Sequence, residues 1–213
     1  MLPLAALALG YLCGSFPSAY LVGRLRGKDV FTVGSGSMGA MNTARNMGPA
    51  LGVAVLLLDV AKGALATFVG LRMASVAGPQ DPQSAAGLLL LPAVFAGSGA
   101  VAGHCYSVFV GFRGGKGLAT ALGVALPLYW LPAVYGLMFI LALVLITKSS
   151  DAATLATFVA YPFITLLTLE RQGWPREDSF LVATGVVIMV LIALPRQVQA
   201  LRHGRRSLDR SRG

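Results

Sequence analysis

The feature that most constrains this chain is a series of long apolar stretches, too many to bury in one water-soluble core. Of its 213 residues, 56% are hydrophobic and only 12% are charged, whereas soluble domains carry about 25% charged residues. A chain of this size cannot hide so much apolar surface inside itself. We therefore predict an all-α, polytopic transmembrane helical bundle of about seven helices. Six apolar runs lie at 2–22, 49–71, 88–110, 118–147, 152–169 and 180–194.

The seventh helix comes from dividing the run at 118–147. This run has no charge and is longer than the roughly 20 residues that one ordinary span needs. Pro127 and Pro132 interrupt it, and an aromatic pair, Tyr129 and Trp130, lies between them. Aromatic residues and proline suit a turn at the membrane interface. We therefore place the division at 129–132.

The cations predict the orientation, because Lys and Arg are enriched in cytoplasmic loops. With seven crossings, thirteen of the seventeen Lys and Arg residues fall on one side, three on the other, and Lys62 within a helix. We predict a multi-pass protein of the inner (plasma) membrane with its N-terminus outside and its C-terminus cytoplasmic. A single membrane domain spans 1–196, and a basic cytoplasmic tail follows at 197–213. The net charge of +9 then reflects topology, and no nucleic-acid partner is expected.

Residues 34–48 form a loop suited to binding an anion. Glycine lets backbone N–H groups approach a ligand, short polar side chains add donors, and arginine offers a fork for phosphate. A plain glycine-rich connector between helices is the alternative interpretation. The residues of interest in this loop are Gly34, Ser35, Gly36, Ser37, Gly39, Asn42 and Arg45.

A second glycine-rich loop falls on the same predicted side of the membrane, which makes an anion site more plausible. It resembles a P-loop only superficially, because Gly117 follows Lys116 where Ser or Thr is required and Val110 replaces the first glycine. Nucleotide hydrolysis is therefore disfavoured. The N–H groups at the start of the next helix and the lysine still favour phosphate. The residues of interest here are Arg113, Gly114, Gly115, Lys116 and Gly117.

Three further polar residues lie in or near the apolar runs. Asp59 and Lys62 are three residues apart, so they share a helix face. We favour an internal ion pair over a functional role for them, and place them away from the loops. His104 has either a structural role or a role in proton transfer. The sequence offers no metal-ligand cluster, and no metal or cofactor is expected.

These motifs together resemble the bacterial membrane glycerol-3-phosphate acyltransferases that use acyl phosphate, often called PlsY. The two loops read close to the family motifs Gly-Ser-Gly-Asn-x-Gly-Ala-Thr-Asn-x-x-Arg and Phe-Lys-Gly-Gly-Lys-Gly-x-Ala-Thr. The resemblance covers most of the chain, and the family is similar in having seven helices with an outside N-terminus. Further matches are Gly14-Ser15-Phe16-Pro17, Leu58-Asp59-Val60-Ala61-Lys62-Gly63 and Gly103-His104.

The resemblance implies a reaction and a set of partners. The 1-hydroxyl of glycerol 3-phosphate would attack acyl phosphate and give lysophosphatidic acid and phosphate. Membrane lipid and an acyl-phosphate-forming enzyme are further expected partners. Because acyl phosphate is already activated, positioning and neutralising the phosphates can supply most of the catalysis.

The resemblance also implies roles for individual residues. Arg45 and Lys116 would clamp phosphates, and Ser35 and Asn42 would donate hydrogen bonds. A phosphate of the substrates themselves would accept the proton. Ser35, Arg45, Lys116 and His104 are the candidate catalytic residues. The candidate substrate-binding residues are Gly34, Gly36, Ser37, Gly39, Asn42, Arg113, Gly114, Gly115, Gly117 and Thr154.

Several positions depart from the family pattern. Ser37 and Met41 replace Asn and Thr, and residues 151–154 replace a Ser-Leu-Ala-Ser-like stretch, so that only Thr154 keeps a hydroxyl. Of the C-terminal motif Arg196 remains, while Gln197 and Ala200 occupy the His and Asn places. These departures leave open a divergent member of the family, with weaker activity, a changed acceptor or no activity. Two alternative functions are also open. One is a non-catalytic transporter or binding protein for a phosphorylated metabolite or lipid, and the other is a purely structural membrane subunit.

Overall fold

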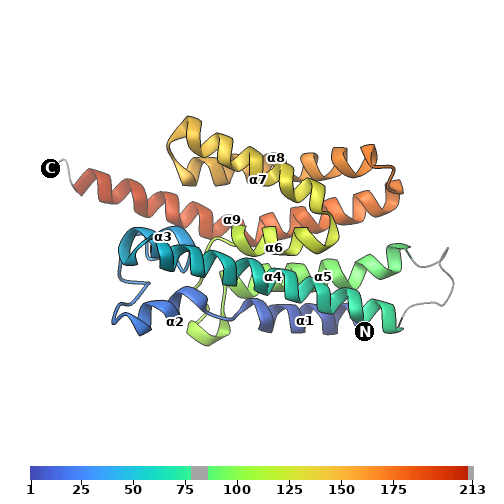
Figure 1. Cartoon of the computed structure of the whole chain (residues 1–213), viewed down its shortest axis with the longest axis horizontal. Coiled ribbons are helices and arrows are strands. Elements are labelled where there is room, and N and C mark those ends of the chain that lie inside the picture. Colours follow the sequence, from blue (N-terminus) through green and yellow to red (C-terminus); the bar gives the residue numbers. More distant parts are fainter. Residues whose placement is uncertain (78–85, 211–213) are drawn as a thin grey trace.

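The computed structural model describes residues 1–77 and 86–210, and the side chains of residues 1–76 and 90–201. This part is an elongated bundle of helices (Figure 1). One group contains α1, α4 and α5, and a second contains α7, α8 and α9; α5 packs on α9, and α6 packs on both α4 and α7. The all-α prediction is confirmed. The helices are α1 Leu2–Gly14, α2 Ser18–Leu25, α3 Ala40–Met47, α4 Pro49–Ala77, α5 Ala86–Cys105, η1 Val108–Val110, α6 Leu118–Leu128, α7 Trp130–Thr147, α8 Ser150–Arg171 and α9 Arg176–Arg210.

The seven predicted apolar segments all form helices, but they are not equally long. Within the described residues, five stretches are long and apolar enough to cross a membrane, and two more are shorter apolar helices, Leu90–Cys105 and Leu118–Leu128. The division of 118–147 is confirmed, because α6 ends at Leu128 and α7 begins at Trp130. The 11 residues of α6 rise only about 16 Å, so α6 alone cannot span the bilayer. The five long stretches are Leu2–Leu25, Pro49–Val76, Trp130–Thr147, Ser150–Arg171 and Arg176–Leu201.

Helices α1 and α5 run parallel and touch through their backbones. A Cβ atom on Gly10 or Gly14 would lie 2.0 Å from a carbonyl oxygen of α5, and one on Gly99 or Gly103 would lie 2.2 Å from a carbonyl oxygen of α1. Only glycine permits this approach, and spacings of four residues on both helices are typical of close packing between membrane helices. The seam fixes the height of α5 relative to α1.

The first apolar segment breaks at 15–17, between α1 and α2. Pro17 has no N–H group and cannot continue the helical hydrogen bonds. The carbonyl groups exposed by the break find partners elsewhere in the fold. Lys62 Nζ donates to Phe16 O at 3.0 Å, and Ser107 Oγ donates to Ser15 O at 2.5 Å. The break therefore ties α1 to both α4 and the loop after α5.

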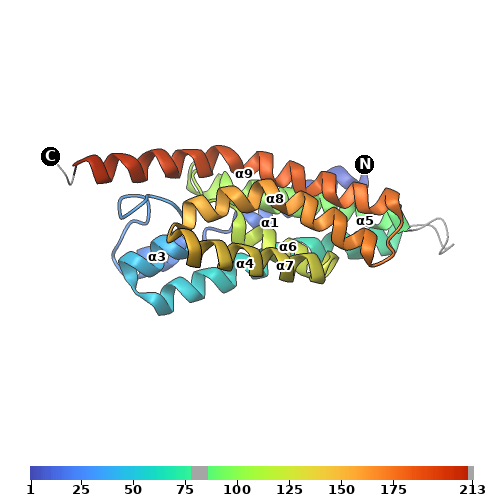
Figure 2. The same cartoon turned by 90° about the horizontal axis from the view of Figure 1, so that it is seen from above.

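Several of the connecting segments lie at one end of the bundle. Figures 1 and 2 show α2, α3, the turn between α7 and α8 and the C-terminal part of α9 at the left end. The turn between α8 and α9 and the end of α4 lie at the opposite end. The predicted cation-rich loops are thus on one side of the bundle. Which side faces the cytoplasm stays a prediction.

Helix α9 continues without a break through residue 196, where we placed the end of the membrane domain. The side chain of Gln197 is fully buried, and its Nε2 donates to Asp151 O of α8 at 2.7 Å. The first residues after this boundary thus pack against the bundle. Side chains from 202 onward and residues 211–213 lie outside the described part, so the basic tail at 197–213 stays a prediction.

Candidate active site

The first loop is folded around the side chain of Asn42 on α3. Its amide donates to Val30 O at 3.1 Å and to Ser37 O at 3.0 Å, and its Oδ1 accepts the N–H of Ser35 at 3.0 Å. Asn46 Nδ2 donates to the same Oδ1 at 3.0 Å. Both N–H groups of the Asn42 amide are therefore already used. In this structure Asn42 shapes the loop from within.

Glycines permit this compact loop. Gly34 and Gly36 have φ angles of +56° and +64°, which side chains rarely adopt. A Cβ on Gly34 would also lie 2.3 Å from Asn46 Nδ2 and 2.4 Å from Asn42 Oδ1. Gly39 is extended and precedes the first residue of α3, where helix N–H groups have no helical acceptor. The N–H groups of Ser35, Gly36 and Gly39 are bonded nearby, so the backbone donors that remain include those at the start of α3.

The second loop follows α5 and closes on Ser107. The N–H of Ser107 donates to Arg113 O at 3.2 Å, and the N–H of Phe112 donates to Ser107 O at 2.8 Å. Gly111 and Phe112 both have left-handed backbones, with φ of +67° and +57°. Gly117 is also left-handed, with φ of +82°, and precedes α6. The sequence predicted a loop from 111, but it begins at 106 because α5 ends at Cys105.

The two loops are in direct contact. The N–H of Met38 donates to Gly114 O at 3.2 Å, and the Arg113 guanidinium lies 4.1 Å from the centre of the Phe31 ring. Met38 is only 1% exposed and belongs to a small apolar cluster with Val30. The predicted anion-binding loops are thus neighbours in space, although they are more than 70 residues apart in the sequence.

The candidate cations differ in how free they are. Arg45 is exposed, and within the described part of the chain no hydrogen bond or ion pair engages its guanidinium. Arg113 is exposed, and its Nε donates to Val110 O at 3.2 Å. Lys116 forms an ion pair with Asp151 at the start of α8. Ser35 is exposed, and among the described residues its hydroxyl has no partner.

The backbone donors of the second loop are partly used. The N–H of Gly115 donates to His104 O at 3.1 Å, so it is not available to an anion in this structure. The N–H groups of Gly114, Lys116 and Gly117 have no acceptor among the residues that the structure describes. Thr154 is buried, and its hydroxyl donates to Ser150 O at 2.7 Å in its own helix.

A buried polar cluster lies beneath the second loop. Asp59 Oδ1 accepts Lys62 Nζ at 2.9 Å and Ser18 Oγ at 2.8 Å, and His104 Nδ1 is 3.5 Å away. The predicted ion pair is confirmed. Its predicted distance from the loops is wrong, because α5 ends one residue after His104 and the loop starts at this level.

His104 supports the loop from below. Its side chain is buried, and a Cβ on Gly115 would lie 2.2 Å from His104 Nε2. A Cβ on Gly114 would lie 2.2 Å from His104 O. The loop therefore needs glycine at both positions to rest on this histidine. These contacts indicate a positioning role for His104.

Two contacts of the site were missed from the sequence. Arg196 on α9 holds the second loop: its Nε donates to Cys105 O at 2.9 Å, its Nη2 donates to Phe112 O, and its guanidinium lies 4.5 Å from the centre of the Tyr106 ring. Asp151 pairs with Lys116. One signal was present, because Asp151 is one of only eight acidic residues and follows the predicted turn at Lys148.

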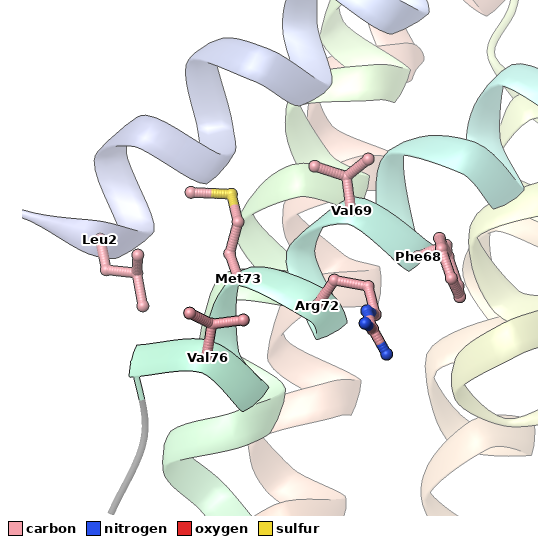
Figure 3. Close-up of a pocket in the computed structure, with 6 residues that line it drawn as sticks. All are labelled: Leu2, Phe68, Val69, Arg72, Met73 and Val76. Atoms are coloured by element: carbon pink, nitrogen blue, oxygen red, sulfur yellow. The ribbon is translucent and has the colours of Figure 1, made fainter.

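A cavity of about 440 Å³ lies at the opposite end of the bundle (Figure 3). It is lined by apolar side chains of α1 and α4 and by Arg72, and contains none of the predicted site residues. It therefore does not contribute to the candidate site.

Comparison with known proteins identifies the family. Residues 4–204 match the model of a family described as glycerol-3-phosphate acyltransferase. A glycerol-3-phosphate acyltransferase of Synechococcus sp. (strain CC9902) is 38% identical over 190 residues, which cover 89% of this chain and 85% of that protein. Glycerol-3-phosphate acyltransferase 1 of Dehalococcoides mccartyi is 40% identical over 189 residues, which cover 87% and 84% of the two chains.

The fold is similar to that of a solved membrane enzyme. A crystal structure of PlsY (YgiH), an integral membrane glycerol 3-phosphate acyltransferase in its glycerol 3-phosphate form, superposes with a TM-score of 0.76 and 27% identity, covering 96% of this chain and 92% of that one. Its lysophosphatidic acid form gives a TM-score of 0.68, with 98% and 90% coverage. By sequence, motifs and architecture, this chain belongs to the glycerol-3-phosphate acyltransferase family of PlsY type.

Proposed function

We propose that this protein transfers an acyl group from acyl phosphate to the 1-hydroxyl of glycerol 3-phosphate, giving lysophosphatidic acid and phosphate. The observation that carries the proposal is the junction of the two glycine-rich loops, joined by the Met38 to Gly114 hydrogen bond. Arg45, Lys116 and the exposed Ser35 belong to these loops. A site that handles two phosphorylated substrates needs several donors in one rigid unit.

Different groups of the two loops have different roles in binding the substrate phosphates. Arg45 offers planar N–H donors that match two phosphate oxygens, and its guanidinium is free to do so. Lys116 supplies a point charge, and Ser35 and Ser37 supply neutral donors. The N–H groups of Gly114 and Gly117 add backbone donors near the start of α6. Asn42, Gly34, Gly36 and Gly39 shape the first loop, and His104 and Gly115 seat the second.

The chemical step needs little covalent help from the protein. The hydroxyl oxygen forms a bond to the acyl carbon as the bond from that carbon to the phosphate oxygen breaks. The departing phosphate takes the hydroxyl proton, so the products are the ester and hydrogenphosphate, and atoms and charge balance. The cations hold together two anionic substrates that would otherwise repel each other. They also stabilise the negative charge on the leaving phosphate.

We place this site on the cytoplasmic side of the plasma membrane. Support comes from the gathering of the cation-bearing segments at one end of the bundle (Figure 1), because Lys and Arg favour cytoplasmic loops. The acyl chain would lie in the lipid phase while both phosphates stay in the polar loops. An enzyme that forms acyl phosphate would supply the donor.

The direct test uses the full chain purified in detergent. It is supplied with palmitoyl phosphate and glycerol 3-phosphate, and the release of phosphate and the formation of lysophosphatidic acid are both measured. Equal amounts of the two products are expected. A parallel reaction with palmitoyl coenzyme A tests the donor, and efficient turnover with that thioester alone would contradict acyl phosphate as the donor.

The main rival is a membrane transporter or binding protein that keeps the anion site without chemistry. It would bind glycerol 3-phosphate and release no phosphate with either donor. Arg196 weighs against this alternative, because the surviving residue of the C-terminal motif still anchors the second loop. Binding without turnover of any donor would overturn the proposed transfer and favour the rival.

A further inference from the structure

The ammonium group of Lys116 has a carboxylate partner within the protein. Asp151, in the first turn of α8, forms an ion pair with it across 35 residues of sequence. Ser149 caps the same turn, since its hydroxyl accepts the N–H of Ala152 at 3.2 Å. The carboxylate thus sits at a helix N-terminus beside a lysine, which is a place that favours an anion.

The first turn of α8 is held in place from a second side. Gln197 of α9 is fully buried, and its Nε2 donates to Asp151 O at 2.7 Å. This bond holds the backbone at Asp151 but leaves its side chain free to move. The position of the carboxylate relative to Lys116 therefore follows from the packing of α8 on α9.

The pair lies where water can reach it. The side chains of Lys116 and Asp151 are 23% and 29% exposed. Ion pairs at such positions contribute little to stability, because both partners are well solvated when they separate. The pair can therefore open at small cost, and a ligand with more negative charge than a carboxylate can replace Asp151 on the lysine.

We propose that Asp151 is an internal competitor of substrate phosphate for Lys116 and thereby sets the affinity of this enzyme for its phosphorylated substrates. In the enzyme without substrate, the Asp151 carboxylate is paired with the Lys116 ammonium group. A substrate phosphate displaces it, and after the reaction the carboxylate returns and helps the product phosphate leave. This inference rests on the proposed role of Lys116 as a phosphate ligand.

The competition between Asp151 and phosphate for Lys116 predicts a measurable change in KM. The apparent affinity of a site falls by the fraction of molecules in which it is free. If Asp151 occupies Lys116 in about nine molecules of ten, removing its charge lowers the KM for the phosphate that Lys116 binds by about 10-fold. Inhibition by inorganic phosphate strengthens by a similar factor, because the same exchange governs the product. The rate at saturation does not rise to the same extent.

The experiment compares Asp151→Asn, which keeps the shape of the side chain, with Glu170→Gln. Glu170 is an acid near the other end of α8, paired with Arg176, so its variant removes one charge far from the site. The KM for glycerol 3-phosphate, the KM for palmitoyl phosphate and the inhibition constant of inorganic phosphate are measured for each. Asp151→Asn is expected to lower at least one KM and the inhibition constant, and Glu170→Gln to lower neither. Unchanged or raised values in Asp151→Asn overturn the proposal.

Two further arms separate this inference from the proposed function. Thermal stabilisation of the protein by inorganic phosphate reports binding without turnover, so Asp151→Asn is expected to reach half stabilisation at about 10-fold lower phosphate. In the Lys116→Ala background the substitution is expected to lose this effect. An effect that persists there shows that Asp151 does not act through Lys116 and overturns the inference. A wild-type protein without turnover refutes the proposed reaction, while the phosphate titration still decides the competition.

Discussion

The part of the chain that the structure describes contains two lysine and aspartate pairs that are alike in chemistry and differ in surroundings. Asp59 and Lys62 lie one turn apart on α4, with exposed fractions of 2% and 5%. Asp151 and Lys116 come from different elements and are 29% and 23% exposed. Lys62 also donates to Phe16 O, and Asp59 accepts Ser18 Oγ. The first pair is enclosed by further partners, and the second faces water.

This difference distinguishes a pair that stabilises the fold from a pair in which a ligand can replace the carboxylate. A buried charge that loses its partner is left without water or counter-ion, and the cost is large. A partly exposed charge regains water when its partner leaves. We therefore expect the first pair to govern stability and the second to govern catalysis. Four measurements test that division.

The largest effect is expected from Asp59→Ala. It leaves the Lys62 ammonium buried without a counter-ion, which costs about 3–5 kcal/mol of folding stability, and lowers the thermal unfolding temperature in detergent by about 10 °C. Adding Lys62→Met should recover much of the loss, because the stranded charge is then gone. An Asp59→Ala protein as stable as the wild type would show that this pair is not structural.

Lys116→Ala should separate activity from stability. We expect the rate of acyl transfer to fall at least about 100-fold, which is the scale for loss of an electrostatic stabiliser. The unfolding temperature should change by no more than about 2 °C, since the lost ion pair is partly exposed to water. A variant with wild-type turnover would remove Lys116 from the site, and a large fall in stability would place both pairs in the same class.

Arg196→Lys should give an intermediate loss. Lysine keeps the charge but not the fork that reaches Cys105 O and Phe112 O, so the second loop loses a charged hydrogen bond. We expect the rate to fall by at least about 10-fold, because such bonds contribute about 1.5–3 kcal/mol and each ~1.4 kcal/mol is a factor of ten in rate. Arg171→Lys at the far end of α8 is the control. Equal rates for both variants would mean that the loop does not depend on α9.

The smallest effect is expected from salt. Raising the salt concentration from about 0.05 to about 0.5 M should raise the KM for glycerol 3-phosphate by a factor of about 2 to 5, because exposed charges are screened. The increase should be steeper in Asp151→Asn, whose site has one more net positive charge. If salt leaves both KM values unchanged, the charges of this site are more enclosed than the exposure of Lys116 indicates.

Local features of the fold could be predicted from the sequence. The apolar runs, the glycines and the prolines determined where helices start and stop, as at Pro49 and at the break around Tyr129. The Asp59 and Lys62 pair was predictable because three-residue spacing on one helix brings side chains together whatever the rest of the chain does.

Contacts between distant segments could not be predicted in the same way. The pairing of Lys116 with Asp151 depends on how α8 packs against α9. The hydrogen bond from Arg196 to Phe112 O depends on the left-handed backbone of Phe112, which no local pattern indicates. The early end of α5 at Cys105 was also missed, because residues 106–110 are as apolar as a helix end would be. They leave the helix to make the tight turn around Ser107.

The break at 15–17 fixes the position of α1 along the bundle axis relative to its neighbours. The glycine seam keeps α1 from sliding along α5, and the two carbonyl groups at the break hold α4 through Lys62 and the second loop through Ser107. A slip of α1 by one helical turn, about 5.4 Å, would release both ties at once. The level in the bilayer at which the acyl group meets its acceptor is therefore set by a helix that contributes no side chain to the proposed chemistry.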